Sequence, residues 1–301
     1  MVVGRVNFAS ATLADGRVLA VGGRIISGSI ANAEIYDPAS GRWAAVPNMS
    51  TPRERPTATT LADGRVLVTG GVVRDGMYLD ATTSAQLHDP KTNSWATAAS
   101  MRVPRADHTA TLLASGKVLV AGNSGDDPAS TELYDPATNV WSAAARMPID
   151  RRAHRAVRLN SGQVMLLGGL YGQAGFSGTA DLYDPRKDTW STAGDMGGLH
   201  GEVRAGLLQD GRVLVVGTGL GSGSLRPERY LGEGTGAPWL FGAREPQLLP
   251  RHANAGRHVA QLFVGDLPGT CAEPAIGRHV DAVGIAEDLD GIEHAIAYQF
   301  R

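Results

Sequence analysis

Cysteine is almost absent from this 301-residue chain, in which Cys271 is the only one. A single thiol excludes an internal disulfide, a Cys-x-x-Cys pair and a structural zinc site built from several thiolates. Any covalent or metal chemistry that requires two thiols is therefore ruled out from the start.

The chain also lacks an excess of charge and a long apolar run. Its formal net charge is −2, with acidic and basic residues interspersed. The chain therefore lacks the extended positive potential that would attract nucleic acid or an anionic membrane. No apolar run approaches the roughly 20 residues that span a bilayer, and no basic segment followed by an apolar stretch marks an export signal. We expect neither a nucleic-acid nor a membrane partner, and the compartment stays open.

Common catalytic signatures are missing as well. The sequence contains no Gly-x-Ser-x-Gly elbow, Walker A loop or His-Glu-x-x-His motif. Asp288, Asp290 and Glu293 match only a fragment of a calcium loop, and the histidines after residue 250 fit no single helix or strand face. We therefore expect no catalytic residue, no metal and no cofactor.

What the sequence does contain is an internal repeat. A turn of the type Asp15-Gly16-Arg17 recurs at Asp63, Ser115, Ser161 and Asp210, with spacings of 48, 52, 46 and 49 residues. An aliphatic stretch such as 66–68 follows each turn, and then a glycine that is usually doubled. Self-similarity at a period near 50 residues is typical of a repeat architecture, and here it gives five copies.

The second half of each of the first four units carries aromatic and sulfur markers at fixed spacing, whereas in the fifth unit Tyr230 lacks the Asp-Pro step and Trp239 lies nine residues after it. A Tyr-Asp-Pro triplet, with His in place of Tyr in the second unit, precedes a Trp by seven residues. A Met lies six residues beyond each Trp, and a basic residue follows four residues later. These markers are Tyr36, His88, Tyr134 and Tyr183; Trp43, Trp95, Trp141 and Trp190; Met49, Met101, Met147 and Met196. We expect the Trp and Met side chains to fill the core between neighbouring sheets.

Each unit reads as four strands. In the second unit, residues 56–61 and 65–69 form a tight hairpin across the Asp-Gly turn, and the Asp-Pro step reverses the chain before the Trp strand, since Pro90 cannot donate to a ladder. A lone four-stranded meander leaves an apolar face exposed, whereas sheets stacked in a ring bury both faces and protect their edges. The sequence therefore predicts an all-β propeller with five recognisable four-stranded blades.

These markers resemble the kelch repeat, in which a double glycine closes the second strand and a Tyr precedes a Trp on the outer strand. The sequence around residues 57–71 is similar to that of bacterial kelch proteins and of the propeller domain of galactose-oxidase-like proteins. The resemblance implies a kelch-type propeller over residues 1–245. Residues 246–301 lack every marker, and they are expected to be either a degenerate sixth blade or an unrelated terminal tail.

Only the loop between the second and third strands of each unit varies in length, with intervals of 13, 17, 11, 14 and 12 residues from the glycine pair to the Tyr position. Variable loops confined to one face of a repeat array indicate its recognition surface. The first residues of each unit belong to the same face. The candidate ligand-binding residues are Arg5, Arg24, Arg53, Arg55, Arg105, His108, Asn123, Arg151, His154, Tyr171 and His200.

Two roles are open for the arginines that begin the units. They can present donors to a carboxylate-bearing peptide or glycan, because the guanidinium fork matches a carboxylate. They can instead bind carbonyls or acids of the adjoining blade and hold the ring together. The sequence alone leaves both open.

The resulting prediction is a non-catalytic, monomeric binding module for a protein, peptide or carbohydrate. The alternative is a relative or fragment of a galactose-oxidase-like copper radical oxidase, a class that requires a Cys cross-linked to a Tyr, or of another carbohydrate-active propeller enzyme. Cys271 is the one residue available for that cross-link. Similar bacterial kelch proteins are often exported, although no signal is visible in this sequence.

Overall fold

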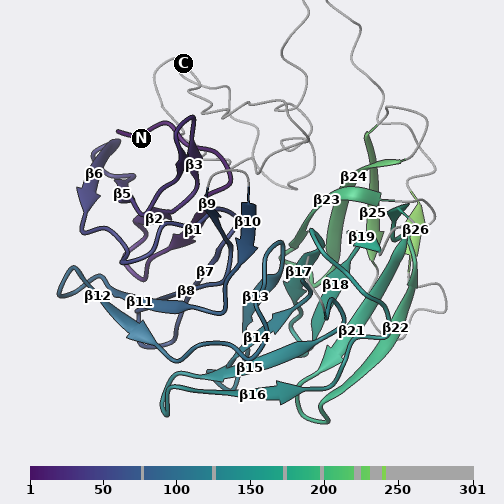
Figure 1. Cartoon of the computed structure of the whole chain (residues 1–301). Coiled ribbons are helices and arrows are strands. Elements are labelled where there is room, and N and C mark those ends of the chain that lie inside the picture. The colour runs from purple at the N-terminus through teal and green to yellow at the C-terminus, as the bar shows by residue number, and fades with distance from the viewer. Residues whose placement is uncertain are drawn as a thin grey trace, which may run out of the picture.

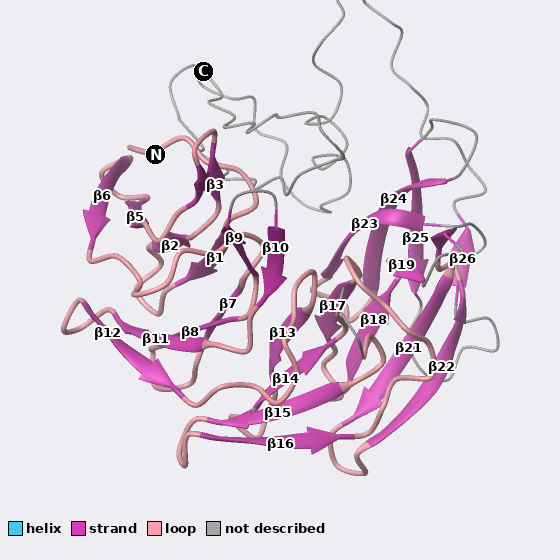
Figure 2. Cartoon of the chain, viewed as in Figure 1, coloured by secondary structure: helices cyan, strands magenta, loops and turns pink. Residues whose placement is uncertain are grey.

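The chain folds into short antiparallel strands. The computed structural model describes residues 1–75, 78–123, 127–171, 175–196, 200–219, 225–230 and 239–241, and none of these residues is helical (Figure 2). Accordingly, this described part of the chain contains no helix with the length and apolar character of a membrane span.

Five four-stranded sheets follow one another along the chain, each with its strands in meander order. The first contains β1 (Ala9–Thr12), β2 (Val18–Val21), β5 (Ala33–Asp37) and β6 (Arg42–Val46), and the second contains β7 (Thr57–Thr60), β8 (Val66–Thr69), β11 (Ala85–Asp89) and β12 (Ser94–Ala98). The third contains β13 (Thr109–Leu112), β14 (Val118–Ala121), β15 (Thr131–Asp135) and β16 (Val140–Ala144). The fourth contains β17 (Arg155–Arg158), β18 (Val164–Leu167), β21 (Thr179–Asp184) and β22 (Thr189–Asp195), and the fifth contains β23 (His200–Leu207), β24 (Val213–Gly219), β25 (Leu225–Tyr230) and β26 (Trp239–Phe241).

The sheets are arranged as blades around a common centre. The first strand of each sheet packs against the first strand of the next, from β1 through β7, β13 and β17 to β23. Figure 1 shows these strands facing the middle of the molecule, while the last strands lie at the periphery. This is the predicted β-propeller architecture. Residues 246–301, predicted as a sixth blade or an unrelated tail, lie outside the described residues.

Three of the variable loops form two-stranded hairpins of their own. They are β3 (Arg24–Ile25) with β4 (Gly28–Ser29), β9 (Val72–Asp75) with β10 (Tyr78–Ala81), and β19 (Leu170–Tyr171) with β20 (Gly175–Phe176). They belong to the three units with the longest loops. In each blade the end of the second strand pairs with the start of the first, as Val21 does with Ala9. The hairpins therefore lie on the same face as the connections between blades, opposite the Asp-Gly turns.

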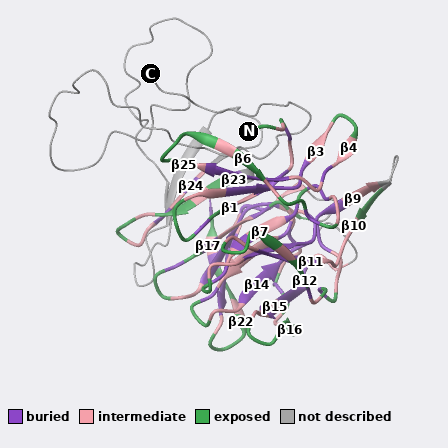
Figure 3. Ribbon diagram, turned by 90° about the vertical axis from the view of Figure 1, so that its left-hand side faces the viewer, coloured by how far each residue is buried: buried purple, intermediate pink, exposed green. Residues whose placement is uncertain are grey.

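The second strand of each of the first four blades is buried on both faces, which explains its continuous apolar sequence. All four residues of β8 are buried. Val66 and Val68 pack with Leu19 and other residues of the first blade, whereas Leu67 packs with Val118 of the third blade. The core is therefore a series of clusters between neighbouring blades, and the exposed residues are concentrated at the turns and on the outermost strands (Figure 3).

The seven-residue spacing places each Trp directly across the outer hairpin from its Tyr or His. Tyr134 pairs with Trp141 in the β15–β16 register, and their ring centroids lie 4.9 Å apart. The indole N–H of Trp141 donates to the Ala99 carbonyl of the preceding blade at 2.7 Å, and Trp190 makes the same bond to Ala145 at 2.7 Å. Trp141 is buried, whereas Trp43, Trp95 and Trp190 are half-buried because the outer strand lies at the rim. Trp95, Trp141 and Trp190 therefore occupy equivalent positions between blades, Trp43 makes the same ring contact with Tyr36, and the four marker methionines are buried in the core.

The glycine pair is required by both conformation and space. Gly70 and Gly71 have φ values of 60° and 92°, a region that residues with a Cβ adopt only at a cost. A Cβ on Gly70 would lie 2.5 Å from the Arg105 carbonyl oxygen. The N–H of Gly71 donates to this same oxygen at 2.8 Å, which joins the second blade to the third.

Candidate functional site

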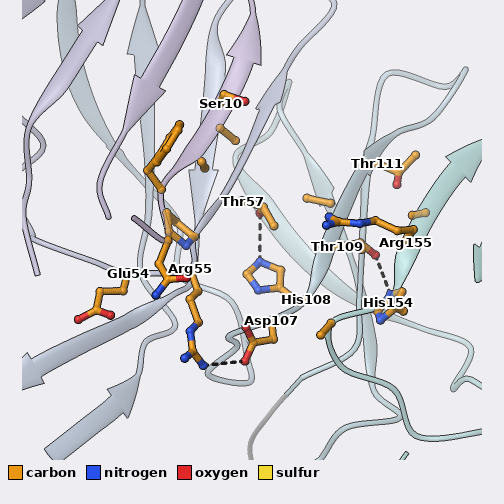
Figure 4. A pocket seen from close by; sticks show the side chains of 18 of the residues that line it. Ser10, Glu54, Arg55, Thr57, Asp107, His108, Thr109, Thr111, His154 and Arg155 are labelled. Carbon is orange, nitrogen blue, oxygen red and sulfur yellow. Dashed lines mark hydrogen bonds and ion pairs between the residues drawn. The ribbon is translucent and has the colours of Figure 1, made fainter. Parts of the chain in front are cut away.

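A cavity of about 780 Å³ lies where the first strands of the blades meet. Its wall comes from β1, β7, β13, β17 and β23, from the connections between blades, and from the bases of the three hairpins (Figure 4). Four of the predicted site residues line it: Arg24, Arg55, His108 and His154. A volume of this size is within the range of small-molecule and peptide-segment pockets.

The charged groups that line the cavity are mainly cationic. Among the described residues of the wall, five arginines face two carboxylates, and the two histidines are neutral. The arginines are Arg24, Arg55, Arg74, Arg155 and Arg204, and the carboxylates are Glu54 and Asp107. A concave surface with this balance attracts anions.

Glu54 holds two of these arginines at the cavity wall. Its carboxylate is buried and accepts hydrogen bonds from the Ser29 hydroxyl and from Arg74 Nε, both at 3.0 Å, and lies 3.5 Å from Arg24 Nε. The side chains of Arg24 and Arg74 are about one-third exposed. One buried acid therefore orients guanidinium groups from two neighbouring hairpins towards the same space.

A second ion pair joins two neighbouring connections. Arg55 Nη1 donates to Asp107 Oδ2 at 3.2 Å, and the Arg55 side chain is 44% exposed. This exposure leaves the guanidinium accessible from the cavity, as Figure 4 shows.

The two histidines of the cavity bond to threonines of the preceding blade. His108 Nε2 lies 3.1 Å from Thr57 Oγ1 and 3.2 Å from Thr69 Oγ1, and His154 Nε2 lies 2.9 Å from Thr109 Oγ1. Burial, reinforced by nearby arginines, lowers the pKa of both rings to about 3. Both are neutral near pH 7, so they link blades and supply no charge to a ligand.

Four predicted residues, the blade arginines Arg5, Arg53, Arg105 and Arg151, lie inside their own blades and not along the cavity wall. All four are at most 3% exposed. Arg105 Nη1 donates to the carbonyls of Gly122 at 3.0 Å and Ser130 at 2.9 Å, and its Nη2 donates to Glu132 at 3.0 Å. Each blade arginine donates in the same way to the carbonyl of the glycine that follows the second strand of its blade, which is Gly22, Gly70, Gly122 or Gly168. Of the two roles left open by the sequence, this geometry favours the structural one.

Arg53 differs from the other blade arginines in having no carboxylate partner. Glu34, Glu132 and Asp181 pair with Arg5, Arg105 and Arg151, but Gln86 stands at this register position in the second blade. Arg53 bonds instead to the Gly70 carbonyl, the Ser84 carbonyl and the Ser84 hydroxyl. Burial lowers the pKa of Arg53 to about 10.

Replacing Gln86 with Glu is expected to raise the free energy of unfolding at neutral pH by about 1–2 kcal/mol, because it supplies the missing counter-charge. Urea unfolding measures the change. Gln86→Met is the control, since it removes the amide without adding charge. A Gln86→Glu protein less stable than wild type contradicts the argument and shows that carbonyl and hydroxyl acceptors satisfy Arg53.

Asn123 and Tyr171 do not line the cavity. Asn123 occupies the place of a second glycine, is fully buried, and accepts a hydrogen bond from the Ala106 N–H at 3.4 Å. Tyr171 is 44% exposed on its hairpin. His200 begins β23.

Sequence reasoning missed several residues of the wall. Glu54, Asp107, Arg155, Arg204 and the hydroxyls of the first strands all line the cavity. Glu54 and Asp107 directly adjoin predicted residues, whereas Arg155 and Arg204 lie on the first strands of their blades. The missed residues could therefore have been identified from their position within the repeat unit, but not from residue types shared between units.

The described residues contain no cluster of three His, Cys, Asp or Glu side chains arranged to hold a metal ion. Cys271, the residue on which the copper-oxidase alternative depends, lies outside them. That alternative stays a prediction.

Comparisons with known proteins bear on the fold. A model of the kelch motif matches residues 5–50 and 151–197, which are the first and fourth units. A solved structure of YjhT aligns with a TM-score of 0.64 and 18% identity, covering 79% of this chain and 84% of that one. At this identity the likeness shows a shared fold.

A fungal alcohol oxidase of the AA5 family, solved in complex with copper, aligns with a TM-score of 0.47 and 16% identity. The alignment covers 71% of this chain and 58% of the oxidase chain, a likeness too distant to bear on activity. No curated protein sequence matches the chain. The motif matches, together with the repeated glycine, tyrosine and tryptophan geometry, identify the fold as a kelch-type β-propeller.

Proposed function

We propose that the protein is a binding module whose central cavity holds a carboxylate-bearing ligand, either an acidic peptide or an acidic glycan. The observation that carries this proposal is the set of five arginines facing two carboxylates in one cavity of about 780 Å³. Guanidinium groups recognise carboxylates through paired hydrogen bonds. The hydroxyls of Ser10, Thr57, Thr109 and Thr111 on the same wall add uncharged polar contacts.

The cavity is suited to hold a ligand on a fixed frame. Arg24 and Arg74 are oriented by Glu54, and Arg55 by Asp107, so these side chains lose little freedom when a ligand binds. The first strands beneath them are packed between blades and provide a rigid base. Recognition residues on loops above a rigid scaffold are typical of binding proteins.

Calorimetric titration with matched acidic and neutral probes tests this function. The probes are trigalacturonate with its methyl ester, and triglutamate with triglutamine, both peptides having blocked ends. At least one acid is expected to bind while its neutral counterpart does not, and added salt is expected to weaken the binding. Equal binding of an acid and its neutral counterpart contradicts the proposal, as does the absence of binding by both acids.

Arg24→Gln is expected to weaken binding of the acidic probe about tenfold, the effect of losing one charged hydrogen bond. Arg65→Gln is the matched control, because Arg65 pairs with Asp63 in a turn on the opposite face. An Arg24→Gln protein with wild-type affinity contradicts the assigned cavity.

A further inference from the structure

The connections between blades place one residue of each of four blades in the same left-handed conformation at the cavity. These αL positions are Asn7, Arg55, Asp107 and Ala153, with φ values of 55°, 52°, 54° and 53°. Each lies two residues after a blade arginine, and each lines the cavity. The repeat therefore delivers four equivalent backbone sites to one space.

Packing fixes the residues on both sides of each αL position. Before it, Val6, Glu54 and Arg152 form isolated bridges with Arg24, Val72 and Leu170 of their own blades. After it, Phe8 and His154 pack closely against glycines. A Cβ on Gly23 would lie 2.9 Å from the Phe8 Cβ, and a Cβ on Gly169 would lie 2.7 Å from the His154 Cβ. The flanking residues are therefore tied to the fold and have little room to change.

The backbone at these positions is also linked from blade to blade. The Arg55 N–H donates to the Asn7 carbonyl at 2.7 Å, and the Ala153 N–H donates to the Asp107 carbonyl at 2.8 Å. The left-handed region costs a residue such as Arg or Ala about 1–2 kcal/mol. Because Arg and Ala adopt it here as Asn and Asp do, the surrounding fold, and not the side chain, imposes the conformation.

The side chains at the αL positions differ in every blade. They are an amide, a guanidinium, a carboxylate and a methyl group, and all four residues are exposed or half-buried, whereas Phe8, Pro56, His108 and His154 just after them are buried. Strained residues that a fold imposes cluster at ligand sites. These positions can therefore change in chemistry without disturbing the blade.

We propose that the four αL positions determine which ligand the cavity accepts, with Arg55 binding the ligand carboxylate and Asp107 limiting the affinity. This inference rests on the proposed function. Asp107 orients the Arg55 guanidinium but also offers it a competing carboxylate at 3.2 Å. An incoming carboxylate must share Arg55 with Asp107 and is repelled by it.

Asparagine substitutions test this assignment, since Asn tolerates the left-handed region and preserves the fold. With the acidic probe that wild type binds, trigalacturonate or triglutamate, Arg55→Asn is expected to lower the affinity at least tenfold. Asp107→Asn is expected to raise it several-fold, and Ala153→Asp to lower it. Arg65→Asn, the same charge change on the opposite face, is expected to leave it unchanged. Thermal unfolding confirms that each variant is folded.

Two results overturn the inference in distinguishable ways. If wild type binds an acidic probe, and the Arg55→Asn and Asp107→Asn proteins both bind it with the affinity of wild type, the αL positions do not determine affinity. The proposed function then still stands. If wild type binds neither acid, both proposals are wrong.

Discussion

Replacing Arg105 with Ala is expected to lower the free energy of unfolding by about 3–5 kcal/mol, the cost of breaking a buried ion pair by removing one partner. Arg105 is fully buried, and its loss leaves Glu132 as a buried carboxylate without its cation. The Gly122 and Ser130 carbonyls lose their side-chain donor as well. Denaturant unfolding followed by tryptophan fluorescence measures the effect.

Matched variants separate this role from a general effect of charge. Arg102→Ala removes an exposed side chain from the same connection and keeps the backbone N–H that donates to Glu132 at 2.8 Å, so little change is expected. Arg105→Lys retains the charge but loses the fork, and it provides a measurable intermediate if the Ala variant does not fold. An Arg105→Ala protein within about 1 kcal/mol of Arg102→Ala contradicts the structural role, since exposed substitutions stay near that range.

Ligand affinity provides an independent readout for the blade arginines. In Arg105→Ala and Arg151→Ala, affinity measured for the folded fraction is expected to equal that of wild type, because neither side chain lines the cavity. Reduced affinity with unchanged stability reverses the assignment and returns these arginines to the binding site.

The blade was predictable because its markers are required by simple physical constraints. Gly70 must lack a Cβ, and the Tyr134 to Trp141 interval spans one hairpin with the two rings directly opposed. Strands expected at 56–61 and 65–69 are found at Thr57–Thr60 and Val66–Thr69. Constraints of this kind recur in every unit, so they are visible as a repeat.

The role of the blade arginines was less accessible because their acceptors lie on distant strands. Arg105 contacts Ser130 and Glu132, 25 and 27 positions along the chain. One signal was nevertheless present, since Glu34, Glu132 and Asp181 each precede the Tyr of their unit by two residues. An acid at this register position, on a buried strand, requires a buried cation.

The composition of the cavity was the least predictable part. Arg74 lies on the hairpin of the second unit, which has the longest of the variable loops. Arg204 belongs to the fifth unit, in which the repeat markers are incomplete. Such residues are positioned by the ring as a whole. The local sequence pattern therefore indicated the face of the propeller that holds the cavity, but not the full set of side chains that line it.

Lowering the pH from 6.5 to 4.5 is expected to reduce the free energy of unfolding by about 5 kcal/mol through His108 and His154. In the unfolded chain each ring takes up a proton near its ordinary pKa of about 6.5. In the folded protein the pKa of each is about 3. Their stabilising effect is therefore complete above pH 6.5 and falls by about 1.4 kcal/mol per pH unit for each ring until the folded pKa is reached.

The environment of the two rings explains why the fold does not accept the protons. Besides burial, Arg105 and Arg53 lower the pKa of His108, and Arg151, His108 and Arg155 lower that of His154. A protonated ring would be a buried cation among cations, and its hydrogen-bond partners in the described part of the chain are threonine hydroxyls. The carboxylates whose pKa is lowered, such as Asp127 and Asp135, add most of their own pH dependence below the lower end of this window.

Replacing both histidines with Phe tests the assignment, because Phe8 occupies this position in the first blade. Urea unfolding of the His108→Phe/His154→Phe protein between pH 6.5 and 4.5 is expected to show a slope smaller than that of wild type by roughly 2–3 kcal/mol per pH unit, the contribution of two rings. His88, whose pKa burial also lowers, accounts for part of the slope that remains. Equal slopes in the two proteins contradict the prediction. A smaller slope in the variant shows that uncharged rings at the centre of the propeller are a condition for holding the blades together.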